Sequence, residues 1–200
     1  EEAKVRIRDA EADGAGLVAV GRDLNDDAGD GDGGIWRSDD GEAWRRAATA
    51  GLGGPGRQEL HRLVRLDDGR WLALGRQMRG AQMTPAVWTS PDLSTWTEAD
   101  GHPSDGSGVP SVWGVAVQDD GAVVAAGSRP GLPGDPAGAE TALWLAEPDA
   151  LGRWRPLDHT PDRLRMTSQV LGKTMPSRAS SQPPRPSSSV ERGSRQMYDW

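Results

Sequence analysis

Apolar residues in this chain come in short runs separated by turns rich in Gly, Asp and Pro. The clearest stretch is 60–99, where LHRLVRL and RWLALG flank Asp67-Asp68-Gly69. Glycine supplies the positive φ of such a turn, so the two runs are predicted to form a β-hairpin. After a loop closed by Pro85, AVWTS and TWTEA flank a second turn, PDLS. The pattern predicts four short antiparallel strands and no helix.

Two phrases recur along the chain in a fixed order. The first reads ADGAGLVAVG, DDGRWLALG and DDGAVVAAG, and its copies end at Gly21, Gly75 and Gly127. The second reads IWRSDDGEAWRRA, VWTSPDLSTWTEA and, more weakly, LWLAEPDALGRWRPL. A four-stranded unit of about 50 residues that repeats is typical of β-propeller blades. A β-sandwich also has short, regularly spaced strands, but it would not explain the period.

The repeats predict an all-β chain, a partial β-propeller of three four-stranded antiparallel blades in residues 1–157. The expected blades cover about 3–47, 60–99 and 111–157. Closed propellers have about four to eight blades, so three leave open edges. We therefore expect missing blades or another copy of the chain to complete the ring.

The repeat stops at residue 158. The segment 158–200 is rich in Ser, Pro and Arg and poor in apolar residues, so we expect it to be mostly disordered. Two explanations stay open for this change of composition: a natural linker tail, or out-of-frame translation of a truncated gene.

The net charge of −7 is unevenly distributed: residues 1–157 carry −10 and residues 158–200 carry +3. An acidic body argues against nucleic acid as a partner, because phosphates need a cationic surface. The mean hydropathy is −0.65. With no run of 18 apolar residues, no transmembrane segment is expected, and no signal peptide is visible. The absence of cysteine excludes disulfides and thiolate metal sites.

The second phrase contains a motif, S-x-D-G-x-x-W or S-x-D-x-x-x-W. It resembles the Asp-box, or bacterial neuraminidase repeat, of sialidase-like β-propellers. The resemblance covers about 150 residues and implies that the motif lies on the turn between the third and fourth strands of a blade. The motif residues are Ser38, Asp40, Gly41 and Trp44 in the first copy, and Ser90, Asp92 and Trp96 in the second.

A structural role is expected for these residues. An Asp on a tight turn accepts bonds from nearby backbone N–H groups, and a Trp can pack across the turn. Catalysis or metal binding is the alternative, but an active site occurs once per protein and not once per blade. The second copy has Leu93 in place of Gly41, and the third has Ala146 in the Ser position.

A ligand is expected at the opposite end of the blades, where the connections are long, with a surface that uses these loops and the ends of the inner strands. These connections are 22–33, 48–59, 76–85, 100–110 and 128–140. Long loops on a rigid scaffold commonly carry binding sites. The candidate ligand-binding side chains there are Arg76, Arg79, His102 and Arg129.

One of these loops contains Asp23-x-Asn25-x-Asp27, a spacing similar to the oxygen ligands of calcium loops. The sixth position is Ala28, not Gly, and no Glu closes the loop. A solvated acidic loop is the alternative, and apart from this weak calcium site no cofactor is expected.

The sialidase resemblance implies a catalytic Tyr with a Glu, an Asp acid/base and three convergent arginines. The only tyrosine is Tyr198, in the tail, so this set cannot be assembled here. We therefore expect a non-catalytic binding or scaffold module that presents long loops to a glycan or protein. The alternative is a fragment of a sialidase-like glycoside hydrolase whose catalytic residues lie in missing blades. The resemblance also implies an extracytoplasmic or secreted protein.

Overall fold

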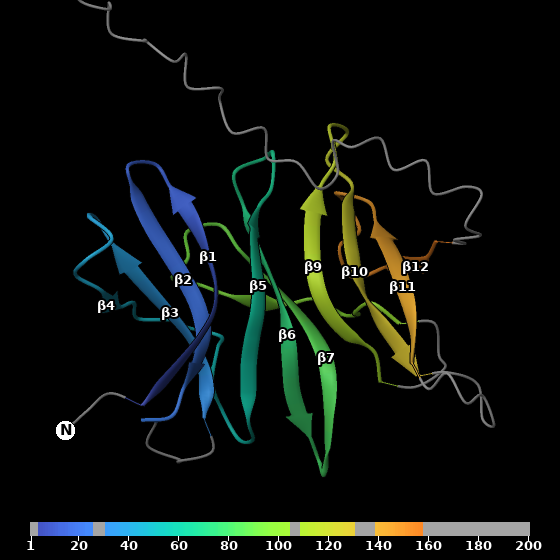
Figure 1. The fold of residues 1–200 in the computed structure, drawn as a ribbon, viewed down its shortest axis with the longest axis horizontal. Helices are drawn as coiled ribbons and strands as arrows, with labels where there is room; N and C mark the ends of the chain where they lie inside the picture. Colours follow the sequence, from blue (N-terminus) through green and yellow to red (C-terminus); the bar gives the residue numbers. More distant parts are fainter. Residues whose placement is uncertain (1–3, 26–30, 105–108, 131–138, 158–200) are drawn as a thin grey trace, which may run out of the picture. The chain divides into compact units, whose positions relative to one another are not determined.

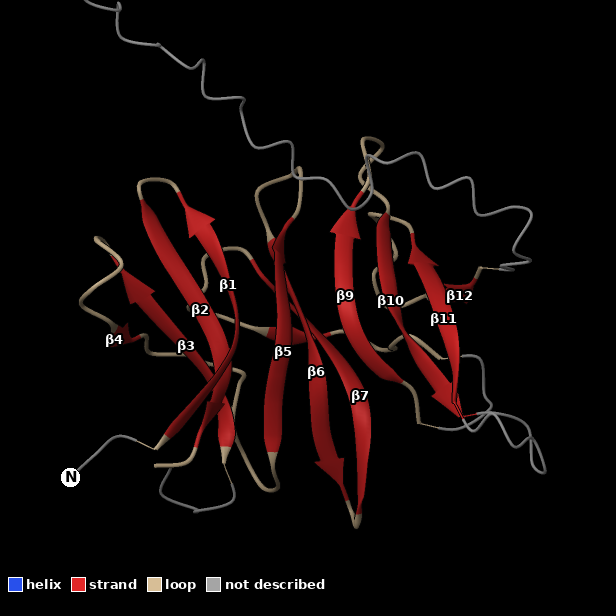
Figure 2. Ribbon diagram, in the orientation of Figure 1, coloured by secondary structure: helices blue, strands red, loops and turns tan. Residues whose placement is uncertain are grey.

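The computed structural model describes residues 4–25, 31–104, 109–130 and 139–157. Regular structure in these segments is entirely β-strand, with no helix among them (Figure 2). The strands form three four-stranded antiparallel sheets, so the predicted partial β-propeller of three blades is confirmed. The segment 158–200, predicted as a disordered tail, lies outside the described residues.

Each blade consists of consecutive strands in chain order (Figure 1). The first blade contains β1 (Val5–Asp13), β2 (Gly16–Asp23), β3 (Asp32–Ser38) and β4 (Arg45–Arg46). The second contains β5 (Gln58–Arg65), β6 (Trp71–Arg79), β7 (Gln82–Ser90) and β8 (Thr97–Glu98). The third contains β9 (Ser111–Val117), β10 (Val123–Pro130), β11 (Ala139–Ala146) and β12 (Arg155–Pro156).

Among the first strands of the blades, β1 contacts β5 and β5 contacts β9, and the three are called the inner strands below. Neighbouring strands in a blade are antiparallel. The turn between strands one and two and the turn between strands three and four therefore lie at the same end, the short-turn end. The connection between strands two and three lies at the other end, the long-loop end.

The prediction of a long loop at 76–85 is wrong. Strand β6 continues to Arg79 and β7 begins at Gln82, with a tight turn at Gly80, whose φ is 61°. Pro85 lies inside β7, opposite Arg76. A proline is tolerated there because β8 pairs with β7 only at Trp88 and Thr89, which leaves β7 without a second partner beside Pro85.

Apolar side chains pack between successive blades in two clusters. Val18, Val20 and Ile35 of the first blade pack against the second blade. Leu72, Leu74 and Val87, on the other side of the second blade, pack against the third. Because side chains alternate between the faces of a strand, each central strand contributes to the packing on both sides. The core therefore lies between the blades and holds them in sequence.

The connection from the first blade to the second is not a free loop. The N–H of Ala50 donates to the carbonyl of Ser94 at 2.8 Å, and the N–H of Trp96 donates to the carbonyl of Ala50 at 2.8 Å. Leu52 is buried in the core between the two blades. Part of the predicted loop 48–59 thus packs against the turn before β8.

Candidate functional site

The short-turn end of the first blade is closed by hydrogen bonds within the motif at 38–44, which resembles an Asp-box and is called by that name below. Asp40 Oδ1 accepts the N–H groups of Glu42 and Ala43 at 2.8 and 2.9 Å. Ser38 Oγ accepts the N–H of Gly41 at 2.8 Å and donates to Asp40 Oδ1 at 3.0 Å. The backbone donors at Ala43 and Glu42 lower the pKa of the Asp40 carboxyl. Its Oδ1 is thus committed to the turn.

The second blade repeats these contacts. Asp92 Oδ1 accepts the N–H groups of Ser94 and Thr95 at 2.8 and 2.7 Å. Ser90 Oγ accepts the N–H of Leu93 at 2.8 Å. Leu93 adopts a φ of 64°, a left-handed conformation that costs a non-glycine residue about 1–2 kcal/mol. Its side chain is fully buried between the blades, which offsets this strain.

The Trp of each motif is anchored to its own turn. Trp44 Nε1 donates to the Gly41 carbonyl at 3.2 Å, and Trp96 Nε1 donates to the Leu93 carbonyl at 3.2 Å. In the third blade Ala146 has no hydroxyl, and backbone bonds hold that turn instead. The Ser and Asp side chains of the first two motifs thus bond to the backbone of their own turns.

The four candidate ligand-binding side chains of the long-loop end each contact a different protein group. Arg76 Nη2 donates to Ser111 Oγ, and Arg79 pairs with Glu98. Arg129 pairs with Glu140 within the third blade, at 2.9 Å. His102 Nδ1 lies 3.2 Å from the carbonyl oxygen of the next residue. Each side chain thus has a protein partner of its own, and a role of these residues in ligand binding stays a prediction.

The proposed calcium ligands are in part occupied by protein groups. Asp23 Oδ2 pairs with Arg46 at 2.5 Å, and Asp23 Oδ1 accepts the backbone N–H of Asn25 at 2.9 Å. Asp27 lies outside the described residues. No group of three or more acidic or His side chains in the described segments is placed to hold a metal. An arginine on Asp23 would compete with a cation, so the calcium site stays a prediction.

A feature that sequence reasoning missed lies on the inner strands. Each inner strand has a β-bulge opposite the recurring glycine of the first phrase. The bulged residues, which lack a partner in the neighbouring strand, are Arg8, His61 and Trp113. A bulge re-aims its side chain and is common near binding sites. Three equivalent bulges therefore bring an arginine, a histidine and a tryptophan to the same level of the inner strands.

The recurring glycines explain how the bulges fit. A Cβ on Gly21, Gly75 or Gly127 would overlap a backbone carbonyl oxygen of the facing inner strand. Only glycine permits such a close approach of two main chains. The closing glycine of the first phrase, a repeat marker in the sequence, is thus the visible signal of the bulge.

Arg62 joins the three bulges. Its Nη1 donates to the His61 carbonyl at 2.7 Å and to the Arg8 carbonyl at 3.4 Å, and its Nε donates to the Trp113 carbonyl at 2.6 Å. A bulge interrupts the strand ladder and leaves such carbonyls in need of donors. The planar guanidinium, with its fork of N–H groups, supplies donors to all three blades at once.

A buried carboxylate lies beside these residues. Glu59 Oε1 accepts from Arg8 Nε at 2.9 Å and Nη2 at 2.5 Å, and Oε2 accepts from Arg57 at 3.2 Å. His61 Nε2 lies 3.5 Å from Oε2. Burial tends to raise the pKa of Glu59, but Arg8 and His61 outweigh it and lower that pKa to about 2. Glu59 is therefore ionised at neutral pH.

Burial lowers the pKa of His61 from its ordinary value, and the nearby Glu59 carboxylate opposes this effect only in part. The imidazole is therefore neutral at pH 7 and offers one hydrogen-bond donor and one acceptor. The side chain of Trp113 is 49% exposed, more than that of any other tryptophan in the described residues. We call Arg8, Glu59, His61, Arg62 and Trp113 the inner-strand cluster. It combines an exposed aromatic ring with charged and neutral hydrogen-bonding groups.

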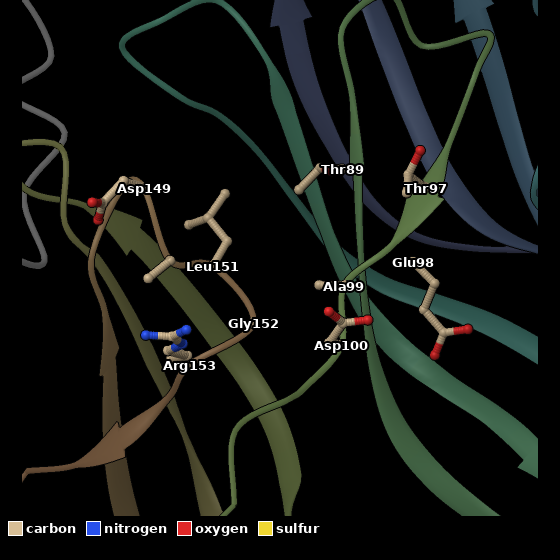
Figure 3. A pocket seen from close by; sticks show the side chains of 10 residues that line it. Thr89, Thr97, Glu98, Ala99, Asp100, Asp149, Leu151, Gly152 and Arg153 are labelled. Atoms are coloured by element: carbon tan, nitrogen blue, oxygen red, sulfur yellow. The ribbon is translucent and has the colours of Figure 1, made fainter.

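Two grooves lie elsewhere. One, of about 530 Å³, runs between the second and third blades and is lined by Glu98 and Asp100 on one side and by the turn that carries Asp149 and Arg153 on the other (Figure 3). The other, of about 260 Å³, lies between the turns at Asp67–Asp68 and Asp119–Asp120. No aromatic side chain lines either groove.

Comparison with known proteins identifies the fold only. No family model matches the chain, and no curated protein matches it. Similar solved structures include a GH32 β-fructofuranosidase of Bombyx mori (17% identity, TM-score 0.48, covering 75% of this chain and 36% of that one). A glycosyl hydrolase from Bacteroides ovatus is 16% identical, with a TM-score of 0.50, covering 80% of this chain and 51% of that one.

A third similar structure belongs to the GH130 family of mannoside phosphorylases, which contains glycoside hydrolases that target β-1,2 mannosidic linkages in Candida mannan. It is 16% identical, with a TM-score of 0.50, covering 80% of this chain and 50% of that one. This chain thus spans about a third to a half of the length of these structures. The described residues contain no helix that is long and apolar enough to span a membrane. The likeness is one of fold: these glycoside hydrolase structures share the β-propeller architecture of this chain.

Proposed function

We propose that this chain is a non-catalytic carbohydrate-binding propeller module and that the inner-strand cluster contacts the sugar. The observation that carries the proposal is Trp113, exposed on an inner strand and linked through Arg62 to Arg8 and His61. A ring whose face carries negative potential attracts the C–H groups of a sugar. Arginine and neutral histidine can bond the hydroxyls. The glycoside hydrolase folds of the similar structures support a glycan over a protein ligand.

The state of Glu59 favours binding over hydrolysis. A glycosidase needs one carboxyl group with a raised pKa to protonate the leaving oxygen. The pKa of Glu59 is lowered to about 2, and both its oxygens accept bonds from arginines. Glu59 is therefore suited to hold Arg8 and Arg57 in position and not to donate a proton.

Binding can be tested on a glycan array carrying neutral mannosides, fructans and sialylated oligosaccharides, with the best ligand then titrated calorimetrically in solution. Trp113→Ala should weaken binding at least about tenfold, because it removes an aromatic contact of more than about 1.4 kcal/mol. Trp44→Ala, which removes a tryptophan of similar exposure at the short-turn end, should leave the affinity unchanged. Binding to no glycan, or equal affinity of Trp113→Ala and wild type, would refute the proposal.

The alternative is that the chain is part of a glycoside hydrolase whose further catalytic groups lie in other blades. The ionised Glu59 on an inner strand is the feature that favours it, since an ionised carboxylate can act as a base or nucleophile. The test is hydrolysis of chromogenic mannosides, fructosides and sialosides. Turnover that is lost in Glu59→Gln but retained in Glu98→Gln would support the alternative and contradict the non-catalytic role.

A further inference from the structure

One side of the first blade carries most of the large apolar side chains that are exposed in the described residues. In the strand pairing, Ile7 lies opposite Gly21 and Leu17 lies opposite Ser38. Arg46 lies opposite Trp36, and Trp44 precedes Arg46 by two residues. This register, together with the alternation of side chains along strands, places Ile7, Leu17 and Trp44 on the same side of the sheet. We call these three residues the blade-one flank.

The repeat shows what the blade-one flank lacks. The equivalent positions of the second blade are Leu60, Trp71 and Trp96. Leu60 pairs with Gly75 as Ile7 pairs with Gly21, and Trp71 pairs with Ser90 as Leu17 pairs with Ser38. Trp96 is the Trp of the second motif, as Trp44 is of the first. Those three side chains are 0%, 3% and 3% exposed, whereas the blade-one flank is 49%, 37% and 41% exposed. The same positions are therefore buried where a neighbouring blade is present.

The structure also shows which residues cover these positions. Val18, Val20 and Ile35 of the first blade pack against the second, together with Leu52. The equivalent residues of the third blade are Val124, Ala126 and Leu143. Val124 and Ala126 precede Gly127 by three residues and by one residue, and Leu143 pairs with Ala126. We call these three residues the blade-three flank. They are only half-buried, whereas Val18, Val20 and Ile35 are fully buried.

We propose that the blade-one flank binds the blade-three flank of a second copy of this chain, and that two copies close one ring. Both halves of the interface are present in each chain and have the apolar character of the two interblade interfaces that the chain already forms. Two copies of three blades supply six, within the range of about four to eight found in closed propellers.

A two-fold ring contains the proposed interface twice, because each copy contributes one flank to each joint. Formation of the first joint makes the second intramolecular, so two modest interfaces act together. The same association covers the apolar flanks of both copies, which otherwise invite aggregation. The two apolar flanks thus favour closure by a second copy.

The oligomeric state tests the proposal. Light scattering on a size-exclusion column should give twice the chain mass of 21.3 kDa at micromolar concentration. Ile7→Asp should weaken the dimer at least about 30-fold, as expected when a buried contact at the centre of an interface is lost. Trp113→Ala, which removes an exposed tryptophan outside both flanks, should leave it intact.

Circular dichroism verifies that Ile7→Asp folds, and Leu17→Asp replaces it if it does not. A monomeric wild type, a dimer that neither flank variant weakens, or an open series of larger oligomers would each overturn the proposal. A monomer would point to a blade encoded elsewhere as the occupant of the flank.

Mixing two variants tests the head-to-tail arrangement. Ile7→Asp and Leu143→Asp should each be monomeric alone, since either change damages both joints of the ring. A mixture of the two should recover a heterodimer, because one joint then combines an unchanged blade-one flank with an unchanged blade-three flank. A mixture that stays monomeric, while wild type is dimeric, would exclude this ring.

Discussion

Replacing Arg62 by alanine should destabilise the propeller more than any other single change at an exposed or half-buried arginine. Arg62 is the donor to the bulge carbonyls of Arg8, His61 and Trp113, and so joins three blades. Without it, these carbonyls keep their bulged positions but lose their donor. Each such hydrogen bond contributes about 0.5–1.5 kcal/mol net.

The magnitude follows from the geometry. The bonds to Trp113 and His61 are short, at 2.6 and 2.7 Å, whereas the bond to Arg8 is long, at 3.4 Å, and contributes little. Arg62 is half-buried, so water replaces part of what is lost. We expect Arg62→Ala to lower the free energy of unfolding by about 3 kcal/mol. Arg62→Lys should lose roughly half as much, because an ammonium lacks the planar fork.

Urea unfolding followed by tryptophan fluorescence measures the effect. For a slope of about 2 kcal/mol per M, a loss of about 3 kcal/mol shifts the midpoint by about 1.5 M. Arg65→Ala is the matched control on the same strand. Its guanidinium lies 5.5 Å from the centre of the Trp71 ring and 3.9 Å from Asp13. Such exposed contacts contribute about 1 kcal/mol or less. If Arg62→Ala costs no more than Arg65→Ala, Arg62 does not join the blades energetically.

Three further predictions concern the glycines, the strained leucine and the buried carboxylate. Gly75→Ala should lower the free energy of unfolding by about 3 kcal/mol or more, because the new Cβ would overlap the Glu59 carbonyl. Gly69→Ala should lower it by only about 1 kcal/mol, because its Cβ meets no atom and only the positive φ is unfavourable. Equal melting temperatures of the two variants would contradict this. Leu93→Gly should relieve about 1 kcal/mol of strain but lose more through the cavity it leaves, for a net loss of about 2 kcal/mol in urea unfolding; a gain in stability would show that strain dominates. The pKa of Glu59 falls from 4.5 to about 2 on folding, so its contribution to the free energy of unfolding is complete above pH 4.5 and is lost as the pH falls toward 2. The stability difference between wild type and Glu59→Gln should therefore shrink over that range. A difference that stays constant would refute the lowered pKa of Glu59.

The sequence predicts the blades well because their signals are local. The turn at Asp67-Asp68-Gly69 and the Asp-box hydrogen bonds depend on residues within a few positions of each other. The loop at 76–85 is mispredicted because strand pairing there continues through polar residues and a proline, which carry no apolar alternation. Hydrophobic periodicity detects burial and not pairing itself.

The inner-strand cluster could not be predicted from the same signals. Arg62 and its three acceptors are brought together only by the packing of three blades, over separations of 51 and 54 residues for the bonds to Trp113 and Arg8. A bulge leaves no pattern of its own in a seven- to nine-residue strand. Gly75 and its equivalents were the one visible sign, and their meaning depends on a carbonyl of another strand.

The contrast between these two kinds of contact has a consequence for the order of folding. Every Asp-box bond closes a loop of two or three residues, whereas the bonds of Arg62 to Arg8 and Trp113 join segments more than 50 residues apart. Short loops close early, and non-local contacts form only after their larger entropy cost has been met. We expect φ-values, the fraction of a mutation's effect already present in the folding transition state, to be high for Asp40→Ala and near zero for Arg62→Ala. The chain would then form its turns independently and join the blades last, so that mutation of Arg62 mainly accelerates unfolding.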